Sequence, residues 1–419
     1  MQHNTRKAVE LRNETIDFAV CPVEPRCRSC ASGDIQVIRK GLDLETPHPY
    51  PLSGDMCLFV CGRCGFIGAQ TSSTEVDYTD YYTNYNKHHI RQGSLSELDK
   101  KYFEKVINFI KGRFPLAFDR TRVLDFGSGA RLFSSMAMNE GASVASNLDL
   151  GVPLNGSAFD LVVSTHCFEH VLDFRSEFAR IRSILRDDGV FCIAVPDVRG
   201  YTDYYYGPYN CFDLEHINHF DCDSLCAALQ EQGLSAVAVM ESERLVTPTL
   251  AYPEVLVLAR RESVGVGLDF RSSRNPVDLV LKNYLDKSFA DMTMGLAFAR
   301  GVFEQDAGKG GGEVAYGLYG LSSYAFRLLR FWDNSEIPLT WFADSDGRLK
   351  GKTIRDVAIF DSGEFATFAS RNSRKGIKTV CFLASVNAYR IAEFLSDLQR
   401  ENALLEVVVL PPDCQNRVN

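Results

Sequence analysis

The chain has 419 residues, of which 45% are hydrophobic and 24% are charged, and its formal net charge is −9. Its length favours two or three domains over one, and its composition is typical of a soluble globular protein. The negative charge argues against a general electrostatic attraction to nucleic acid or to anionic membranes. The amino terminus is too polar for a signal peptide, and no apolar run approaches the roughly 18 residues of a membrane span. We therefore predict a cytoplasmic protein whose 13 cysteines are reduced thiols.

Two Cys-x-x-Cys pairs, CRSC (27–30) and CGRC (61–64), lie near the amino terminus. Each pair can present two thiolates to one ion, and two pairs complete the tetrahedral sulfur shell that zinc prefers. A closed shell leaves no position for water, which favours a structural zinc over a catalytic one. Four unrelated buried thiols or a redox dithiol remain alternatives, and Cys21 or Cys57 could replace a ligand. The predicted ligands are Cys27, Cys30, Cys61 and Cys64.

A tyrosine-rich segment, DYTDYYTNYNKHH (77–89), follows the cysteines. It could be an exposed amphipathic linker with aromatic anchors, or a lid that contacts substrate through its aromatic rings. The next segment, SLSELDKKYFEKVINFIKGRF, predicts a helix because a serine cap is followed three residues later by an acid.

The middle of the chain alternates between predicted strands and helices. The strand in TRVLDF ends at Asp125, a helix follows in RLFSSMAMNEG, and a second strand carries Asp149 near its end. FDLVVST then opens into a turn with His166, and FRSEFARIRSILRDDG predicts a helix that Gly189 caps before the strand VFCIAVPDV. This alternation predicts parallel βαβ units, whose ligands bind beyond the carboxyl ends of the strands.

Gly127 and Gly129 follow the first of these strands, in VLDFGSGARLFSS. Glycines let a backbone approach a ligand that a Cβ atom would block. The turn could hold a dinucleotide pyrophosphate, but Arg131 stands where the third glycine of that pattern is expected. It could equally hold a cofactor without phosphate, with an acid on the next strand binding ribose hydroxyls. The two glycines alone do not decide between these cofactors.

The order VLDFGSGA, FDLVVSTHCFEHV, ILRDDGVFCIAVPD resembles the class I S-adenosylmethionine-dependent methyltransferases over about residues 100–262. The resemblance implies that Asp125, Gly127 and Gly129 hold the methionine part of the cofactor, and we add Asp149 and His166 to that site. Phe159 lies only ten positions after Asp149, which is too few for the family's usual helix and strand. A degenerate fold that binds the cofactor weakly or not at all is therefore an alternative.

A Glu215-His216 pair lies in PYNCFDLEHINHF. Histidine is suited to removing a proton near neutral pH, and an adjacent carboxylate can orient it; alternatively, His216 and His219 only pack this loop. With the two cysteine pairs, this loop resembles that of the zinc-containing C-methyltransferases of nucleotide-linked deoxysugars. Their Tyr-x-Glu-His loop takes a proton from the carbon next to a keto group, and Asp213 occupies the tyrosine position here.

The same resemblance implies a tyrosine from the lid-like segment in the site. We assign it to Tyr82, with Tyr81 and Tyr85 as neighbours that could take its place. The implied catalytic residues are thus His216, Glu215 and Tyr82.

The last third of the chain begins with a predicted long helix over about residues 276–304 and continues as strand, glycine turn and helix. This part resembles the Rossmann-like carboxyl-terminal domain of the same C-methyltransferases. It could form a wall of the acceptor site or act only as a stabilising partner.

The predicted fold is α/β, a Rossmann-like methyltransferase core with an N-terminal zinc-binding module and a C-terminal Rossmann-like domain. The boundaries we expect are a zinc-binding module at 1–75, the methyltransferase domain at 76–262, a helical connector at 263–306, and the C-terminal domain at 307–419.

The resemblance implies S-adenosylmethionine and structural zinc as cofactors and a small-molecule acceptor, in particular a nucleotide-linked sugar. No nucleic acid or membrane is expected as a partner. A degenerate fold that binds a sugar nucleotide or a protein, and an O- or N-methyltransferase acting on another small molecule, remain the alternative functions.

Overall fold

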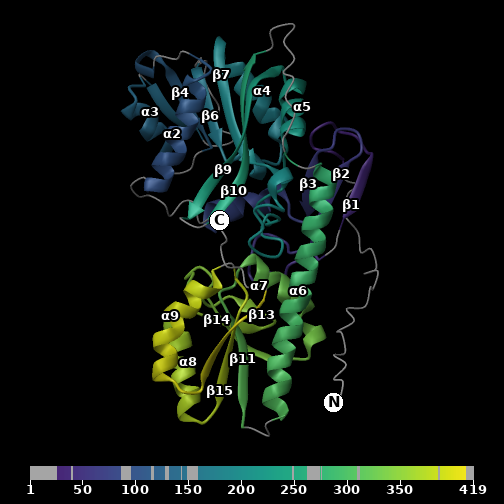
Figure 1. Ribbon diagram of the computed structural model, residues 1–419, viewed down its shortest axis with the longest axis vertical. Coiled ribbons are helices and arrows are strands. Elements are labelled where there is room, and N and C mark those ends of the chain that lie inside the picture. The colour runs from purple at the N-terminus through teal and green to yellow at the C-terminus, as the bar shows by residue number, and fades with distance from the viewer. Residues whose placement is uncertain are drawn as a thin grey trace.

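The computed structural model describes residues 26–38, 41–85, 96–114, 118–127, 132–142, 144–148, 159–247, 250–261, 274, 276–308, 312–385 and 387–411. These residues form three sheets, which lie one after another along the molecule with helices packed on them (Figure 1). The prediction of a mixed α/β fold is confirmed. None of the helices in these ranges is both long and apolar enough to cross a membrane.

The amino-terminal sheet contains β1 (Ile35–Ile38), β2 (Met56–Cys61) and β3 (Ile67–Thr71), all antiparallel, and β3 also pairs with β8 (Asn218–His219). Ile67 lies opposite His219 in that pairing. Because β8 directly follows the Glu215-His216 pair, the amino-terminal sheet holds one end of the loop that carries this pair.

The tyrosine-rich segment forms helix α1 (Glu75–Asn84), and α2 (Glu97–Lys111) follows it. Each helix begins with a capping box, from Thr74 to Asp77 and from Ser96 to Asp99, which satisfies backbone donors that a helix start leaves free. The serine cap predicted for α2 is confirmed. Residues 77–85 have one exposed face, with Thr79 and Asp80, and one face on which Tyr78 and Tyr81 are buried.

The central sheet has the strand order β5-β4-β6-β7-β10-β9. Its first four strands are parallel, and β10 runs antiparallel to both neighbours. The strands are β4 (Arg122–Phe126), β5 (Val144–Leu148), β6 (Phe159–Thr165), β7 (Leu185–Pro196), β9 (Leu234–Thr247) and β10 (Leu250–Arg261). In the part of the chain that the structure describes, β5 is the edge strand, which fits the short connection between Asp149 and Phe159.

Helices cover both faces of the central sheet, because alternate strand residues point to opposite sides. Val123 and Leu161 belong to the apolar cluster shared with α2 and α3 (Leu132–Asn139). Leu124 and Val162 belong to the opposite cluster, shared with α4 (Phe174–Ile184) and α5 (Cys222–Glu231). Short 3₁₀ turns complete this region: η2 (Phe118–Arg120), η3 (Phe168–His170) and η4 (Val198–Gly200).

One predicted boundary in this region is wrong. The sequence places a helix up to Gly189, but α4 ends at Ile184 and β7 already begins at Leu185. Gly189 therefore lies inside a strand. A Cβ atom there would come within 2.9 Å of the Phe159 carbonyl oxygen on β6, so the glycine serves close strand packing rather than a helix cap.

The carboxyl-terminal sheet has the order β13-β14-β12-β11-β15-β16, with all but β13 parallel. Its strands are β11 (Val314–Tyr319), β12 (Leu339–Ala343), β13 (Thr353–Ile354), β14 (Val357–Phe360), β15 (Lys378–Leu383) and β16 (Leu405–Val409). Its helical elements are α7 (Ser323–Phe331), η5 (Trp332–Ser335), α8 (Ser362–Arg374) and α9 (Ala388–Glu401). The parallel strands in chain order 3-2-1-4-5 follow the Rossmann pattern.

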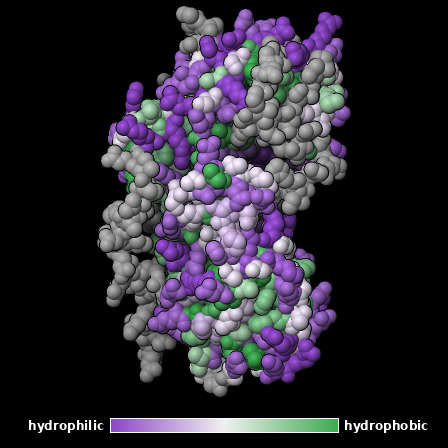
Figure 2. Space-filling view, turned by 180° about the vertical axis from the view of Figure 1, so that it is seen from behind, coloured by the Kyte–Doolittle hydropathy of each residue, from purple (hydrophilic) through white to green (hydrophobic). Residues whose placement is uncertain are grey.

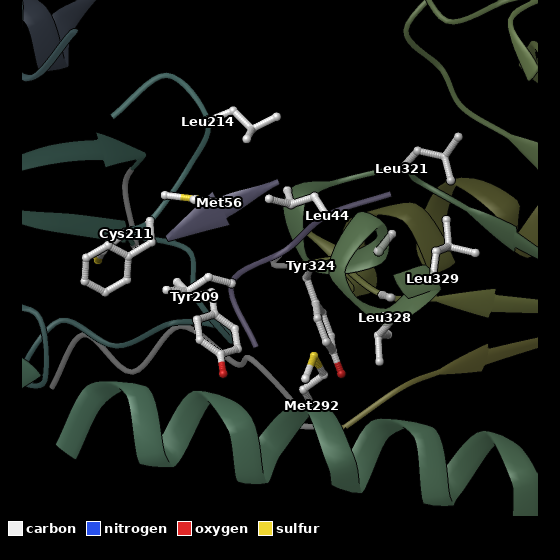
Figure 3. Packing of buried hydrophobic residues seen from close by; sticks show 14 of the residues in the cluster. Leu44, Met56, Tyr209, Cys211, Leu214, Met292, Leu321, Tyr324, Leu328 and Leu329 are labelled. Atoms are coloured by element: carbon white, nitrogen blue, oxygen red, sulfur yellow. The ribbon is translucent and has the colours of Figure 1, made fainter. Parts of the chain in front are cut away.

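Helix α6 (Val277–Gly308) runs beside the amino-terminal sheet and then along the carboxyl-terminal sheet (Figure 1). One apolar cluster joins these parts, and it includes Met56 of β2, Tyr209, Met292 of α6 and Leu328 of α7 (Figure 3). Burial of these side chains in one shared cluster fixes the carboxyl-terminal sheet against the rest of the molecule.

Seen from behind, the surface of the molecule is mostly hydrophilic, with scattered apolar side chains (Figure 2).

Candidate active site

The four predicted cysteine ligands lie together. Their sulfur atoms are all within 4.8 Å of one another, with 3.5 Å between Cys27 and Cys64 and 3.6 Å between Cys30 and Cys61. Zinc–sulfur bonds of about 2.3 Å in a tetrahedron place sulfurs about 3.8 Å apart, so this cluster has the size of a zinc shell. Cys57 is buried in β2 but is not part of the cluster, and Cys21 lies outside the described residues.

The glycine turn begins as the sequence predicts. Gly127 has φ +71°, and a Cβ atom there would come within 2.3 Å of the Cys167 sulfur. Asp125 at the end of β4 is fully buried, and one of its carboxylate oxygens accepts bonds from the Ser134 amide at 3.0 Å and hydroxyl at 3.1 Å. The acid therefore ties the strand to the start of α3. Gly129, Arg131 and Asp149 lie outside the residues whose side chains are described.

His166 follows β6 in a left-handed conformation, with φ +50°. Its Nε2 lies 3.0 Å from a carboxylate oxygen of Glu254, and its Nδ1 lies 3.4 Å from Glu169. Burial opposes the charged form, but the two carboxylates more than offset it and raise the pKa of His166 above 6.5. Lys105, which is half-buried, bonds the other oxygen of the buried Glu254 at 2.5 Å, so Glu254 links a lysine to His166.

Next to His166, η3 brings two further polar side chains to the same sheet edge. Glu169, His170 and His216 each contribute one nitrogen or oxygen atom, and these atoms lie within 4.8 Å of one another. The rings of His170 and His216 are 4.8 Å apart at 67°. His170 donates through Nδ1 to the Glu215 carbonyl oxygen at 2.9 Å, which directs its Nε2 toward Glu169, 3.9 Å away.

The charge state of this cluster follows from its surroundings. Burial alone would raise the pKa of Glu169, but the hydrogen bond with His166 and the nearby histidines lower it to about 2. Burial and the adjacent His170 lower the pKa of His216 to about 4. Near neutral pH, Glu169 is thus a carboxylate and His216 a neutral imidazole able to accept a proton.

The tyrosines of α1 reach the same place. Tyr81 donates its hydroxyl to the Glu215 carboxylate, so this carboxylate is oriented by a tyrosine of the lid-like segment. Tyr82 packs edge-on against Tyr81 and against His170, with ring centroids 5.4 and 6.2 Å apart. Burial, and then the charge of Glu215, raise the pKa of Tyr82 well above 10, so it remains a neutral phenol.

Three buried polar atoms at this site have no hydrogen-bond partner among the described residues. They are the Tyr82 hydroxyl, one Glu169 carboxylate oxygen and Nδ1 of His216. An unpartnered buried polar atom costs about 1–3 kcal/mol, so three of them in one place mark this as a candidate binding site.

The structure thus brings together Tyr82, Glu215 and His216, and it places His166 and Gly127 beside them through η3 and Cys167. Sequence reasoning did not assign Glu169 or His170 a role. The signal was present in the CFEHV segment, which the resemblance to class I methyltransferases itself includes. His219 is buried, its Nδ1 lies 3.0 Å from the Tyr201 hydroxyl, and its Nε2 has no hydrogen-bond partner among the described residues.

Comparison with known proteins defines the class of the central domain. Residues 98–239 match the family model described as a methyltransferase domain. This match covers most of the strands and helices of the central sheet, and it supports the prediction that this part of the chain is a methyltransferase domain. No curated protein matches the chain.

Several solved structures resemble part of the chain. A putative S-adenosylmethionine-dependent methyltransferase from Listeria monocytogenes is 16% identical over 37% of this chain and 97% of its own, with a TM-score of 0.31. A 1,6-didemethyltoxoflavin-N1-methyltransferase from Burkholderia thailandensis is 17% identical over 48% and 98%, with a TM-score of 0.34. A magnesium protoporphyrin IX methyltransferase from Synechocystis PCC 6803 is 14% identical over 44% and 97%, with a TM-score of 0.32.

Proposed function

We propose that the protein transfers a methyl group from S-adenosylmethionine to a carbon atom of a nucleotide-linked sugar, with His216 as the general base. The observation that carries this proposal is the unpartnered Nδ1 of His216 beside a carboxylate and a second histidine. A carbon acceptor must lose a proton, and a neutral, half-buried imidazole can take it. Oxygen or nitrogen acceptors need little more than positioning.

The residues around the Gly127 turn fit the cofactor. Gly127 has a positive φ, and the Cys167 sulfur fills the space where its Cβ atom would lie, so the glycine lets the turn after β4 pack against the turn after β6. We assign Asp125, Gly127, Gly129, Asp149 and His166 to this site. When bound, S-adenosylmethionine supplies an activated methyl group.

The chain's own residues divide the acceptor chemistry among them. His216 accepts the proton at Nδ1 from the carbon next to the acceptor's keto group, and the Glu169 carboxylate stabilises the imidazolium that forms. In this proposal the Tyr82 hydroxyl donates a hydrogen bond to the keto oxygen, where negative charge develops. The Tyr81 hydroxyl donates to the Glu215 carboxylate, so in this proposal a tyrosine of α1 orients the carboxylate next to the base.

The zinc proposal rests on the four sulfurs and their spacing. Cys27, Cys30, Cys61 and Cys64 would hold the ion in a closed shell, where it stabilises the amino-terminal sheet. Through the pairing of β3 with β8, that sheet positions the chain just after His216. The zinc is therefore structural in this proposal and takes no part in the transfer.

Hydrogen exchange tests the base directly. The protein would be incubated in D₂O with S-adenosylhomocysteine and a panel of nucleotide-linked keto sugars, and deuterium beside the keto group would be followed by NMR. We expect exchange with the wild type and a loss of at least about 100-fold in His216→Ala. Exchange that survives in His216→Ala would remove the proposed base, and methylation that continues normally would favour an oxygen or nitrogen acceptor.

A further inference from the structure

The segment 209–213, directly before Glu215 and His216, is held by elements of the carboxyl-terminal half of the chain. Three of its bonds go to α6: the Tyr209 amide donates to the Ser288 hydroxyl at 3.1 Å, and the Cys211 amide to the Tyr284 hydroxyl at 3.0 Å. The Tyr284 hydroxyl in turn donates to the Asn210 side chain at 3.1 Å. Two consecutive turns of α6 thus fix the start of this segment.

Helix α7 holds the other end of the segment. Arg327 donates from Nη2 to the Phe212 carbonyl oxygen, and its guanidinium carbon lies 5.2 Å from the centre of the Tyr209 ring. Ser323, one turn earlier on α7, donates to a carboxylate oxygen of Asp213 at 3.1 Å. The side chains of α7 therefore contact the two residues that open the turn to His216.

The turn itself is short. The His216 amide donates to the Asp213 carbonyl oxygen at 3.1 Å, and the Glu215 carbonyl oxygen accepts from His170. Asp213 thus connects α7 to His216, because its carboxylate accepts from Ser323 and its carbonyl oxygen accepts from the His216 amide. A displacement of Phe212 or Asp213 would shift the imidazole relative to His170.

Burial of the charged Arg327 side chain costs more free energy than an apolar side chain would in the same place. Arg327 is fully buried, and its Nε and Nη1 have no hydrogen-bond partner in the part of the chain that the structure describes. Burying an ion costs several kcal/mol, and an apolar residue of similar volume is often as stable or more so. What the guanidinium supplies is a planar, rigid donor of fixed direction, together with a positive charge that interacts favourably with Asp213.

We propose that Arg327 is a positioning residue for the active site: the carboxyl-terminal domain sets the geometry of Glu215 and His216 through the contact of Arg327 with Phe212. The inference rests on the proposed function, because it assigns Arg327 an effect on the base. According to this proposal, the carboxyl-terminal domain positions active-site residues in addition to stabilising the rest of the protein.

The test follows the His216 imidazole by NMR in full-length protein labelled at histidine, bound to S-adenosylhomocysteine. Variants Arg327→Met, Arg327→Lys and Ser323→Ala would be compared with Arg330→Met, which removes an exposed arginine from the same helix. We expect the His216 signals to shift in Arg327→Met and Ser323→Ala, to return partly in Arg327→Lys, and to stay in place in Arg330→Met. Cofactor affinity should be unchanged in all four.

Turnover gives a second readout once an acceptor is known, and a misplacement of this kind would lower kcat by about 10- to 100-fold in Arg327→Met. Unshifted His216 signals in a folded Arg327→Met protein would overturn the inference, even if the variant melts at a lower temperature. If Arg327→Met does not fold, Ser323→Ala decides in the same way. Shifted signals without turnover of any nucleotide-linked keto sugar would support the positioning role and count against the proposed function alone.

Discussion

His170 and His216 lie ring to ring, with their centroids 4.8 Å apart and their planes at 67°. They come from different segments, because His170 ends η3 beside the central sheet while His216 precedes β8 of the amino-terminal sheet. Each of these parts therefore supplies half of the pair. Two neighbouring imidazoles that were both charged would repel each other, so the pair favours a neutral His216.

Acid should destabilise the protein through His216. Its pKa is 6.5 in the unfolded chain and about 4 in the folded protein, so between these values the unfolded chain binds more protons. The free energy of unfolding therefore falls as the pH is lowered from 6.5 toward 4, and this contribution is fully present above pH 6.5. We expect wild type to lose about 1 kcal/mol more than His216→Asn between pH 7 and pH 5.

Urea unfolding at the two pH values measures this difference. An identical pH dependence in wild type and variant would show that His216 has an ordinary pKa in the folded state. The same titration predicts that hydrogen exchange in the acceptor declines only as the pH approaches about 4, because the base is neutral above that value.

We expect the Tyr82 hydroxyl to lower the free energy of unfolding but to raise the rate of turnover. It is buried without a hydrogen-bond partner among the described residues, and removing such a group relieves a desolvation penalty. We expect Tyr82→Phe to raise the free energy of unfolding by up to about 1 kcal/mol and to lower turnover by about 10-fold or more.

Tyr78 on the same helix provides the matched control. Its hydroxyl donates to the Leu214 carbonyl oxygen at 3.2 Å, so Tyr78→Phe should lower stability by about 1 kcal/mol. Denaturant unfolding of both variants makes the comparison. Equal destabilisation by the two substitutions would mean that Tyr82 has a partner in solution and would weaken its assignment to the acceptor.

The sequence predicted the parts of the molecule that local chemistry determines. The Ser96 cap, the strand that carries Asp125 and the long helix α6 follow from capping and periodicity, which act over a few residues. The error at Gly189 has a tertiary cause, since the Phe159 carbonyl oxygen on β6 occupies the space where a side chain would lie. Nothing near Gly189 in the sequence reveals that neighbour.

The sequence predicted which segments contribute to the site, but not which of their side chains contact one another. The sequence indicated Glu215 and His216 as partners because they are adjacent, whereas adjacent residues commonly point in different directions. In the structure the Glu215 carboxylate bonds Tyr81, and the ring next to His216 is that of His170. Such pairings depend on how three sheets are packed, which spacing along the chain does not specify.

The Gly127 turn can be tested with a rescue experiment. Gly127→Ala places a Cβ atom 2.3 Å from the Cys167 sulfur at a φ of +71°, so we expect S-adenosylhomocysteine affinity to fall by at least about 10-fold, as about 1–2 kcal/mol of backbone strain alone implies. Cys167→Ala removes the sulfur, and the double variant should recover part of the affinity. Gly301→Ala, where no atom lies within 4 Å, should bind normally.

Calorimetric titration of the four proteins distinguishes the causes. Wild-type affinity for S-adenosylhomocysteine in Gly127→Ala would mean that the cofactor does not bind at the Gly127 turn. A double variant as weak as the single one would mean that the backbone conformation, rather than the contact with Cys167, requires the glycine.

Zinc should be needed for the amino-terminal sheet and, through it, for the site. We expect about one zinc per chain by elemental analysis, and its loss in Cys61→Ser, because three sulfurs and a hydroxyl are a poor shell for this ion. Cys57→Ser changes a buried cysteine of the same strand that lies outside the cluster, and it should retain the metal. Since β3 pairs with β8, removal of zinc should also shift the NMR signals of His216 while S-adenosylhomocysteine still binds. Equal metal content in the two variants would contradict the ligand assignment, and unshifted His216 signals in the metal-free protein would separate the zinc from the active site.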